Sequence, residues 1–146
     1  MSHPNTVAKY RATAERTRWV NRENGDARSI EPGGTLVIAD MDGPGVVEQF
    51  WNTVNAEDPF YPRSLVLRVY YDGAEKPSVE APLGDFFGVG HGAFREFSSA
   101  PITVTALGRA RACYWRMPFR KHFRMTVTND AKGKVDSFYW YLNWRK

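Results

Sequence analysis

Apolar and polar residues alternate along most of this chain, and that alternation constrains the fold more than any other feature of the sequence. In the run Leu65, Leu67, Val69 and Tyr71, apolar side chains occupy every second position, with Arg68 among the residues between them. A period of two places such side chains on one face of a β-strand. The alternating runs end in Gly, Pro, Asn or Asp, which favour turns. The pattern therefore predicts many short strands joined by tight turns.

Eight or nine strands are predicted between residues 34 and 145. The longest alternating runs cover residues 46–54, 65–71, 123–128 and 138–145, and shorter strands are expected near residues 78–81, 94–97, 101–105 and 111–117. No helical pattern separates these runs, so the crossover connections that a parallel sheet needs are missing. The predicted fold class is all-β: a single jelly-roll-like antiparallel β-sandwich with a short N-terminal helix.

The N-terminal segment differs from the rest of the chain. Residues 4–18 are the only stretch with helical character, because Val7, Tyr10 and Ala14 form a thin apolar stripe. Residues 21–26 have the polar composition of a loop. We expect residues 1–26 to form an N-terminal helix and polar loop, and residues 27–146 to form one β-sandwich domain. A chain of 146 residues is long enough for one such core.

Several other classes of protein are excluded by composition and spacing. The single cysteine, Cys113, can neither close an intramolecular disulfide nor form a cysteine-based zinc cluster. His3, His91 and His122 lack the spacing of metal ligands, and no glycine-rich phosphate loop opens a helix, so no metal and no cofactor is expected. No apolar run approaches the ~18 residues of a membrane span. The N-terminus has no signal-peptide pattern, so we expect a cytoplasmic protein without a membrane partner.

The net charge of +4 is unevenly distributed along the chain. Residues 29–62 hold six acidic residues and no Lys or Arg, whereas residues 97–129 hold six basic residues and no acidic one. Two interpretations stay open: solvated outer faces and turns, or an acidic and a basic surface that meet within the chain or between subunits. No recognition-helix or RNA-binding signature accompanies the basic residues. Nucleic acid is therefore not an expected partner, and a nucleic-acid-binding sandwich is the weakest alternative.

Two loops carry the side chains best suited to binding. Residues 82–92 combine four glycines and two phenylalanines with Asp85 and His91. Glycines permit close approach of a ligand, and rings stack on sugars or bases; the simpler interpretation is a structural bend in which Asp85 caps loop amides. Residues 117–122 carry three cationic or titratable groups, which suit an anion or an acidic partner surface, or else form an exposed basic turn.

Six short motifs occur in a set order along the chain. They are IEPG (residues 30–33), DGPGVV (42–47) with FW (50–51), LRVYYDG (67–73), KPSVEAPLGDFFG (76–88), MPFRK (117–121) and VTN (127–129). With this order and spacing, residues 24–144 resemble glycoside hydrolase family 172. The resemblance implies two jelly-roll β-sandwiches in tandem and assembly into trimers or larger rings. It also implies activity on fructofuranose- or arabinofuranose-containing sugars, by a retaining mechanism that uses two glutamates.

The resemblance assigns no catalytic residue within this chain, because the family's two glutamates lie in the second jelly roll. The chain is expected to be the N-terminal half, which shapes the sugar pocket and the subunit contacts. Asn24-Gly25-Asp26 matches the end of a polar loop that lines the family's pocket. Just before it the family has Asp-Arg-x-Gly-Gly, where this chain has Trp-Val-Asn-Arg-Glu (residues 19–23). Either Trp19 replaces a stacking surface there, or the loop has lost the site.

The leading hypothesis is a glycoside hydrolase family 172-like protein that acts on furanose glycosides and assembles as a homo-oligomer. The residues expected to contact the sugar, through polar groups and stacking, are Asn24, Asp26, Trp51, Asp85 and His91. The alternative is a non-catalytic jelly roll that serves assembly or carbohydrate binding.

Overall fold

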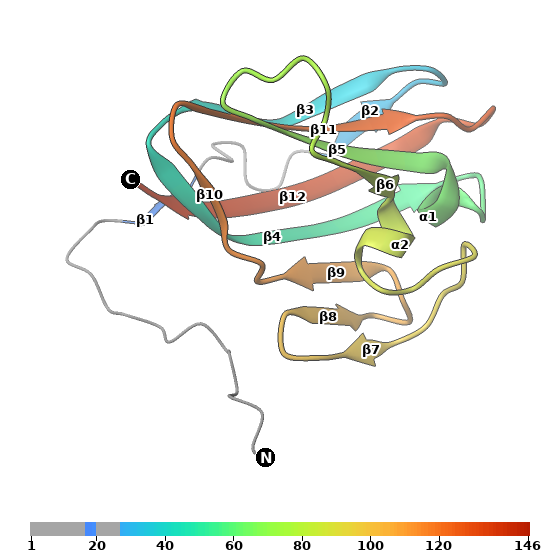
Figure 1. Ribbon diagram of the computed structural model, residues 1–146. Helices are drawn as coiled ribbons and strands as arrows, with labels where there is room; N and C mark the ends of the chain where they lie inside the picture. Colours follow the sequence, from blue (N-terminus) through green and yellow to red (C-terminus); the bar gives the residue numbers. More distant parts are fainter. Residues whose placement is uncertain (1–16, 20–26) are drawn as a thin grey trace.

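Two antiparallel β-sheets packed face to face make up the protein (Figure 1). The structure is a computed structural model that describes residues 17–19 and 27–146. Its strands are β1 (Thr17–Trp19), β2 (Arg28–Ile30), β3 (Thr35–Asp42), β4 (Gly45–Ala56), β5 (Leu65–Tyr71), β6 (Val79–Pro82), β7 (Phe97–Ser98), β8 (Ile102–Thr105), β9 (Ala110–Cys113), β10 (Met117–Phe119), β11 (His122–Asn129) and β12 (Val135–Arg145). The predicted antiparallel β-sandwich is confirmed.

The larger sheet has the order β1-β12-β4-β9-β8-β7, with β10 also paired to β4 and β2 to β12. The smaller sheet has the order β3-β11-β5-β6. The chain passes repeatedly between the sheets, since β3 lies in the small sheet, β4 in the large one and β5 in the small one again. Strands far apart in sequence therefore become neighbours, as β4 and β12 do over ten paired positions.

Within residues 34–145, where strands were predicted, the predicted strands agree with the observed ones except at two places; β2, which precedes them, was not predicted. The strand expected near 94–97 is reduced to β7, because only Phe97 and Ser98 pair with β8. The strand expected at 111–117 is two strands, β9 and β10, which both pair with β4 but at different positions along it. Residues 114–116 connect them, so the single predicted strand makes two separate pairings with β4.

Two short helices were not predicted from the sequence, which favoured a helix only at residues 4–18. They are α1 (Tyr61–Ser64) and α2 (Leu83–Phe86), each a single turn. One turn is too short to show a helical period or to be stable alone, so its stability comes from packing. Tyr61 and Leu83 are buried beneath these turns. Thr17 and Arg18 belong to β1, so the predicted helix is wrong at its last two residues; residues 4–16 and the predicted loop at 21–26 lie outside the described residues.

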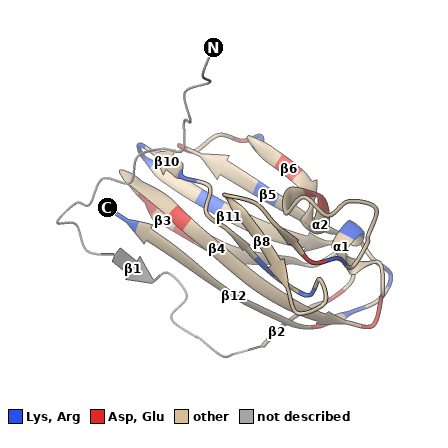
Figure 2. Ribbon diagram, turned by 90° about the horizontal axis from the view of Figure 1, so that it is seen from below, with Lys and Arg blue, Asp and Glu red and all other residues tan. Residues whose placement is uncertain are grey.

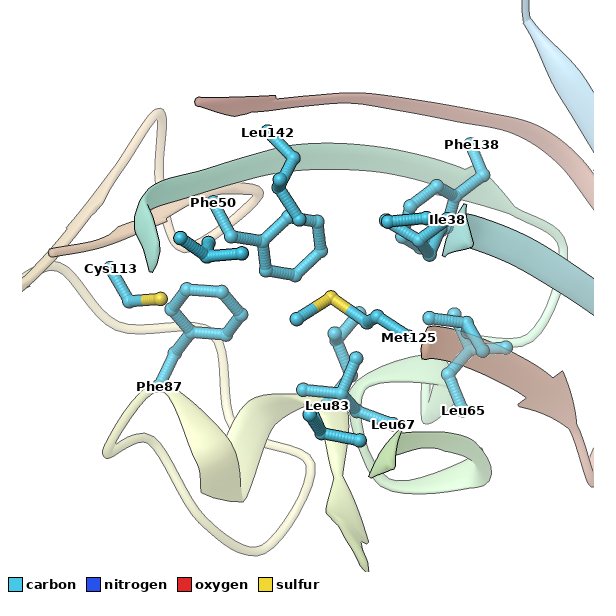
Figure 3. Close-up of a cluster of buried hydrophobic side chains, with 14 of the residues drawn as sticks. Ile38, Phe50, Leu65, Leu67, Leu83, Phe87, Cys113, Met125, Phe138 and Leu142 are labelled. Atoms are coloured by element: carbon cyan, nitrogen blue, oxygen red, sulfur yellow. The ribbon is translucent and has the colours of Figure 1, made fainter. Parts of the chain in front are cut away.

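Apolar side chains from both sheets and from α2 fill the space between the layers (Figure 3). Phe50 and Leu142 come from the large sheet, Leu67 and Met125 from the small one, and Phe87 from the loop after α2; all five are fully buried. Burial of such side chains contributes about 1.5–3 kcal/mol each. The alternation predicted for residues 65–71 and 138–145 thus orients one face of each strand toward this core.

The turn between β3 and β4 packs tightly against β10 and β12. A Cβ atom on Gly45 would lie 2.7 Å from the Phe119 ring and 3.0 Å from the Trp144 ring. Glycine fits at this position without displacing these rings, so the turn at residues 42–45 is also a packing contact between the ends of three strands.

Candidate functional site

Trp51, one of the predicted sugar-contact residues, lies on the outer face of the large sheet. Its neighbours Phe50 and Asn52 point inward and are fully buried, so the pleat of β4 places Trp51 on the opposite side. The Trp51 indole stacks on the Tyr141 ring, with centroids 5.0 Å apart and planes 11° apart. The two residues are directly paired across β4 and β12.

Amide side chains border this ring pair. Gln49 Nε2 donates to the Tyr141 hydroxyl at 3.4 Å, and Asn143 Nδ2 donates to Gln49 Oε1 at 2.8 Å. Burial of the ring raises the pKa of Tyr141, and the nearby Tyr114 phenol raises it further. We call the set Trp51, Tyr141, Gln49, Asn143 and Tyr114 the aromatic face. Half-exposed rings beside hydrogen-bonding amides are chemically suited to a sugar, which offers an apolar face and a ring of hydroxyls.

The strands on either side of Asn24 and Asp26 both pair with β12. Trp19 of β1 lies opposite Asn143, and Arg28 of β2 lies opposite Phe138. Asn24 and Asp26 themselves lie outside the described residues. Their predicted role stays a prediction, and the described strands around them run along the edge of the strand that carries Tyr141.

Asp85 and His91 lie in the α2 loop, away from the aromatic face. The Asp85 carboxylate forms an ion pair with Arg63, which ties α2 to α1. The other carboxylate oxygen, Oδ1, is buried and has no hydrogen-bond partner among the described residues. His91 is exposed and has a left-handed backbone with a φ of +61°.

The structure does not bring the described candidates together. Phe87, next to α2, packs on Phe50 with ring centroids 6.0 Å apart, on the inner side of the large sheet. Trp51 is on the outer side of the same sheet. Trp51 and Asp85 therefore do not form one pocket. Sequence reasoning missed Tyr141, Gln49 and Asn143 as partners of Trp51, although the alternation of β12 had placed Tyr141 and Asn143 on a shared face.

The basic turn at residues 117–122 binds a carboxylate of its own chain. Asp72 Oδ1 accepts hydrogen bonds from the backbone N–H groups of Arg120 at 2.9 Å, Lys121 at 2.6 Å and His122 at 3.3 Å. The Lys121 N–H is the largest influence that lowers the pKa of Asp72. Backbone N–H groups rather than the basic side chains hold this carboxylate, and Arg120 and Lys121 are exposed, as expected for an exposed basic turn.

The acidic and basic segments also meet within the chain. Asp40 on β3 accepts from His122 Nε2 at 2.6 Å and forms an ion pair with Arg124, both on the adjacent strand β11. A further pair, Arg68 with Glu80 at 2.6 Å, joins β5 to β6 in the same sheet. Figure 2 shows this last pair as a blue segment on β5 beside a red one on β6. Part of the charge segregation in the sequence thus reflects pairing between neighbouring strands.

The motifs of the sequence are joined in pairs by contacts in the fold. Asn129 Nδ2 donates to the Ile30 carbonyl at 3.0 Å, and the Gly33 N–H donates to the Asn129 carbonyl at 2.7 Å. Asp72 joins a second pair of motifs through Lys121. The close contact of Gly45 with Phe119 joins a third. These motif residues hold the sandwich together rather than line a pocket.

Comparison with known families agrees with this set of motifs. Residues 7–146 match the family model for the GH172 first β-sandwich domain. The chain belongs to glycoside hydrolase family 172. No curated protein matches it significantly. The match to the first sandwich of GH172 confirms the family resemblance seen in the motifs. Within the described residues, no helix has the length and apolar character to cross a membrane.

Proposed function

We propose that this GH172 protein acts on furanose glycosides, and that this chain supplies a wall of the sugar pocket and contacts between subunits. The observation that carries the proposal is the aromatic face, where the stacked rings of Trp51 and Tyr141 adjoin the amides of Gln49 and Asn143. Stacking with a sugar ring needs an exposed, rigid aromatic surface, and the cross-strand pairing of these two residues provides the rigidity.

The chemical step is assigned to no residue of this chain. Retaining hydrolysis needs two carboxyl groups about 5–5.5 Å apart, one as nucleophile and one as acid and base. Asp85 is engaged with Arg63, and Glu80 with Arg68, in ion pairs that serve the fold. We expect the 146-residue chain to bind a furanoside without hydrolysing it, while the second sandwich typical of the family supplies the glutamates.

Calorimetric titration with fructo-oligosaccharides tests the aromatic face. The Trp51→Ala variant is expected to bind up to about tenfold more weakly, since stacking on an aromatic ring contributes about 0.5–1.5 kcal/mol. Tyr70→Ala, which removes a half-exposed ring from β5 of the other sheet, is the matched control and should bind like the parent chain. Equal affinity of all three proteins, or no binding by any of them, would contradict the proposal.

The assembly part of the proposal predicts a homo-oligomer, a trimer or a multiple of it. The pairing of Asp40 with His122 and Arg124 uses some of the charge that an electrostatic contact between subunits would need. The association is therefore expected to persist when salt is raised. Light scattering across a salt series measures this, and a monomer at every salt concentration would count against it.

A further inference from the structure

A cavity of about 330 Å³ lies at one end of the sandwich and belongs to none of the surfaces described above. It is formed by the end of β4, the segment that leads into α1, and the turn between β8 and β9, which lie at the same end of the molecule (Figure 1). Its lining includes Asn55, Glu57, Tyr61, Phe94, Leu107 and Arg109. No member of the aromatic face lines it. The volume is at the lower end of the range for small-molecule sites.

Two rings in its wall are held rigidly from behind. Tyr61 and Phe94 meet edge to face, with centroids 5.5 Å apart. The guanidinium of Arg111, only 1% exposed, lies 5.4 Å from the Tyr61 ring centroid and donates to the Tyr61 hydroxyl at 3.4 Å and to the Arg109 carbonyl at 3.0 Å. No carboxylate among the described residues pairs with this buried cation. Arg111 therefore fixes the position of Tyr61 and of the Arg109 backbone together.

The opposite wall is a strained turn. Ala106 and Leu107 have φ values of +53° and +57°, a left-handed conformation that non-glycine residues seldom adopt. Leu107 is nevertheless 77% exposed, so no burial of its side chain compensates for the strain. Its N–H donates to Glu96 Oε1 at 3.2 Å, and Gly108 approaches the Phe94 backbone so closely that a Cβ atom would lie 2.8 Å from the Phe94 Cα. Strain held in this way is typical of ligand clamps.

The polar groups at the cavity indicate the class of ligand. Glu57 offers only acceptors, Arg109 only donors, and Asn55 both. Asp58, also in the lining, is engaged with the Phe60 N–H at 2.8 Å and the Ser64 hydroxyl at 3.3 Å. The Glu57 carboxylate and the Arg109 guanidinium carry opposite charges, so together they favour neither an anion nor a cation. Hydroxyl groups both donate and accept, and a sugar ring has an apolar face for the accessible side chains of Phe94 and Leu107.

We propose that this cavity is a second carbohydrate site, which holds a neutral sugar ring between Phe94 and Leu107, with the buried Tyr61 ring supporting Phe94 edge to face. The hydroxyl groups of the sugar bond to Asn55, Glu57 and Arg109. The site is separate from the aromatic face, and it holds whether or not the aromatic face binds a furanose. Glu96 and Arg111 are positioning residues, since each acts on a wall of the cavity through another residue.

Titration of the isotope-labelled 146-residue chain with small glycosides, followed by backbone amide resonances, tests the proposal. The probes are methyl β-D-fructofuranoside and methyl α-D-glucopyranoside, with glucuronate and glucosamine as charged controls. Either neutral glycoside is expected to shift the amides of Asn55, Leu107 and Arg109, and to do so at lower concentration than the charged sugars. Trp51→Ala should leave these shifts unchanged, which distinguishes this site from the aromatic face.

The double variant Glu57→Gln, Arg109→Gln removes both charges and leaves a polar amide at each position. It is expected to weaken binding at the cavity by about tenfold or more, because hydrogen bonds to charged groups are the stronger ones. Shifts confined to the aromatic face would overturn the proposal. So would tighter binding of a charged sugar than of a neutral one, or an unchanged affinity in a folded double variant. If that variant fails to fold, the set of amide resonances that shift in the parent chain decides whether the cavity binds the sugar.

Discussion

The Asp72 carboxylate lies 2.6 Å from the backbone nitrogen of Lys121, and this hydrogen bond joins the turn after β5 to the turn between β10 and β11. Together with the neighbouring N–H groups it holds the pKa of Asp72 below the ordinary value. A carboxyl group whose pKa is lowered by folding stabilises the fold above its unfolded pKa, and that stabilisation is lost as pH falls through the folded pKa.

Asp72→Asn is expected to be less stable than the parent chain at neutral pH, because a neutral amide oxygen is a weaker acceptor. Asparagine tolerates the positive φ of this position, so the comparison isolates the charge. The difference between the two proteins should begin to shrink as pH falls below the ordinary aspartate pKa of about 4, and it should be lost once pH has fallen through the lowered pKa of folded Asp72. Urea unfolding at a series of pH values measures it, with Asp136→Asn at an exposed position as control. A constant difference at all pH values would contradict the assignment.

Asn129 should be one of the least replaceable polar residues of the fold. It is fully buried, and its amide donates to the Ile30 and Gly133 carbonyls and accepts from the Ala131 N–H. Asn129→Ala is expected to lower the free energy of unfolding by about 2–4 kcal/mol, since one buried and two partly buried backbone groups lose their partner. Asn55→Ala, at an exposed site, should change it by less than about 0.5 kcal/mol. Thermal and urea unfolding of both variants decide the point.

Asn52 is equally buried, but its replacement is expected to stabilise the fold rather than destabilise it. Neither its amide nitrogen nor its carbonyl oxygen has a hydrogen-bond partner among the described residues. Asn52→Val removes two unsatisfied polar atoms and introduces a residue that favours strands, so the free energy of unfolding should rise by about 1–2 kcal/mol. The same unfolding measurements apply. A loss of stability of that size would show that the amide makes a necessary contact.

A glycine in the strained turn at the cavity should raise the stability of the fold and weaken binding at the cavity. Leu107→Gly relieves the left-handed conformation, and we expect it to raise the free energy of unfolding by about 1 kcal/mol. The same variant removes the apolar wall and should weaken the neutral-glycoside titration. Val37→Gly, which truncates another exposed apolar side chain but on β3, is expected to destabilise the strand without affecting that titration. Unchanged binding by Leu107→Gly would show that Leu107 does not contact the sugar.

Cys113 should be inert in the native protein. It is fully buried, and burial raises the pKa of its thiol to about 11. Because the thiolate is the reactive form, reaction with Ellman's reagent near pH 8 is expected to be at least about a hundredfold slower than in the unfolded chain. Absorbance at the wavelength of the released thiolate follows the reaction with and without guanidinium. Rapid stoichiometric labelling of the native protein would contradict the burial.

The local alternation of residue types was sufficient to predict most strands and their inward faces. Leu65, Leu67 and Val69 are all fully buried, as their spacing predicted, because the pleat of a strand is a property of the strand itself. The six motifs were likewise sufficient to predict the family. The two helical turns escaped prediction, since α1 and α2 are each too short to leave a period and depend on packing for their stability.

The arrangement of the candidate site could not be predicted in the same way. Trp51, Asp85 and His91 were grouped by their chemistry, yet the fold places Trp51 on the outer face of the large sheet and Asp85 beside its inner face. Tyr141 became the partner of Trp51 only through the pairing of β12 with β4. Which strands pair depends on contacts between residues far apart in the chain, and the period of one strand carries no information about its neighbour.

The sequence by itself therefore determined the class of fold, the inward and outward residues of each long strand, and membership of GH172. Only the tertiary structure decided that Asp72 would occupy the basic turn, that Trp51 would meet Tyr141, and that Tyr61, Phe94 and Leu107 would enclose a cavity. The physical reason is the range of the interactions. Alternation is set by backbone geometry between adjacent residues, whereas a site is made by sheet order and packing that bring distant residues together.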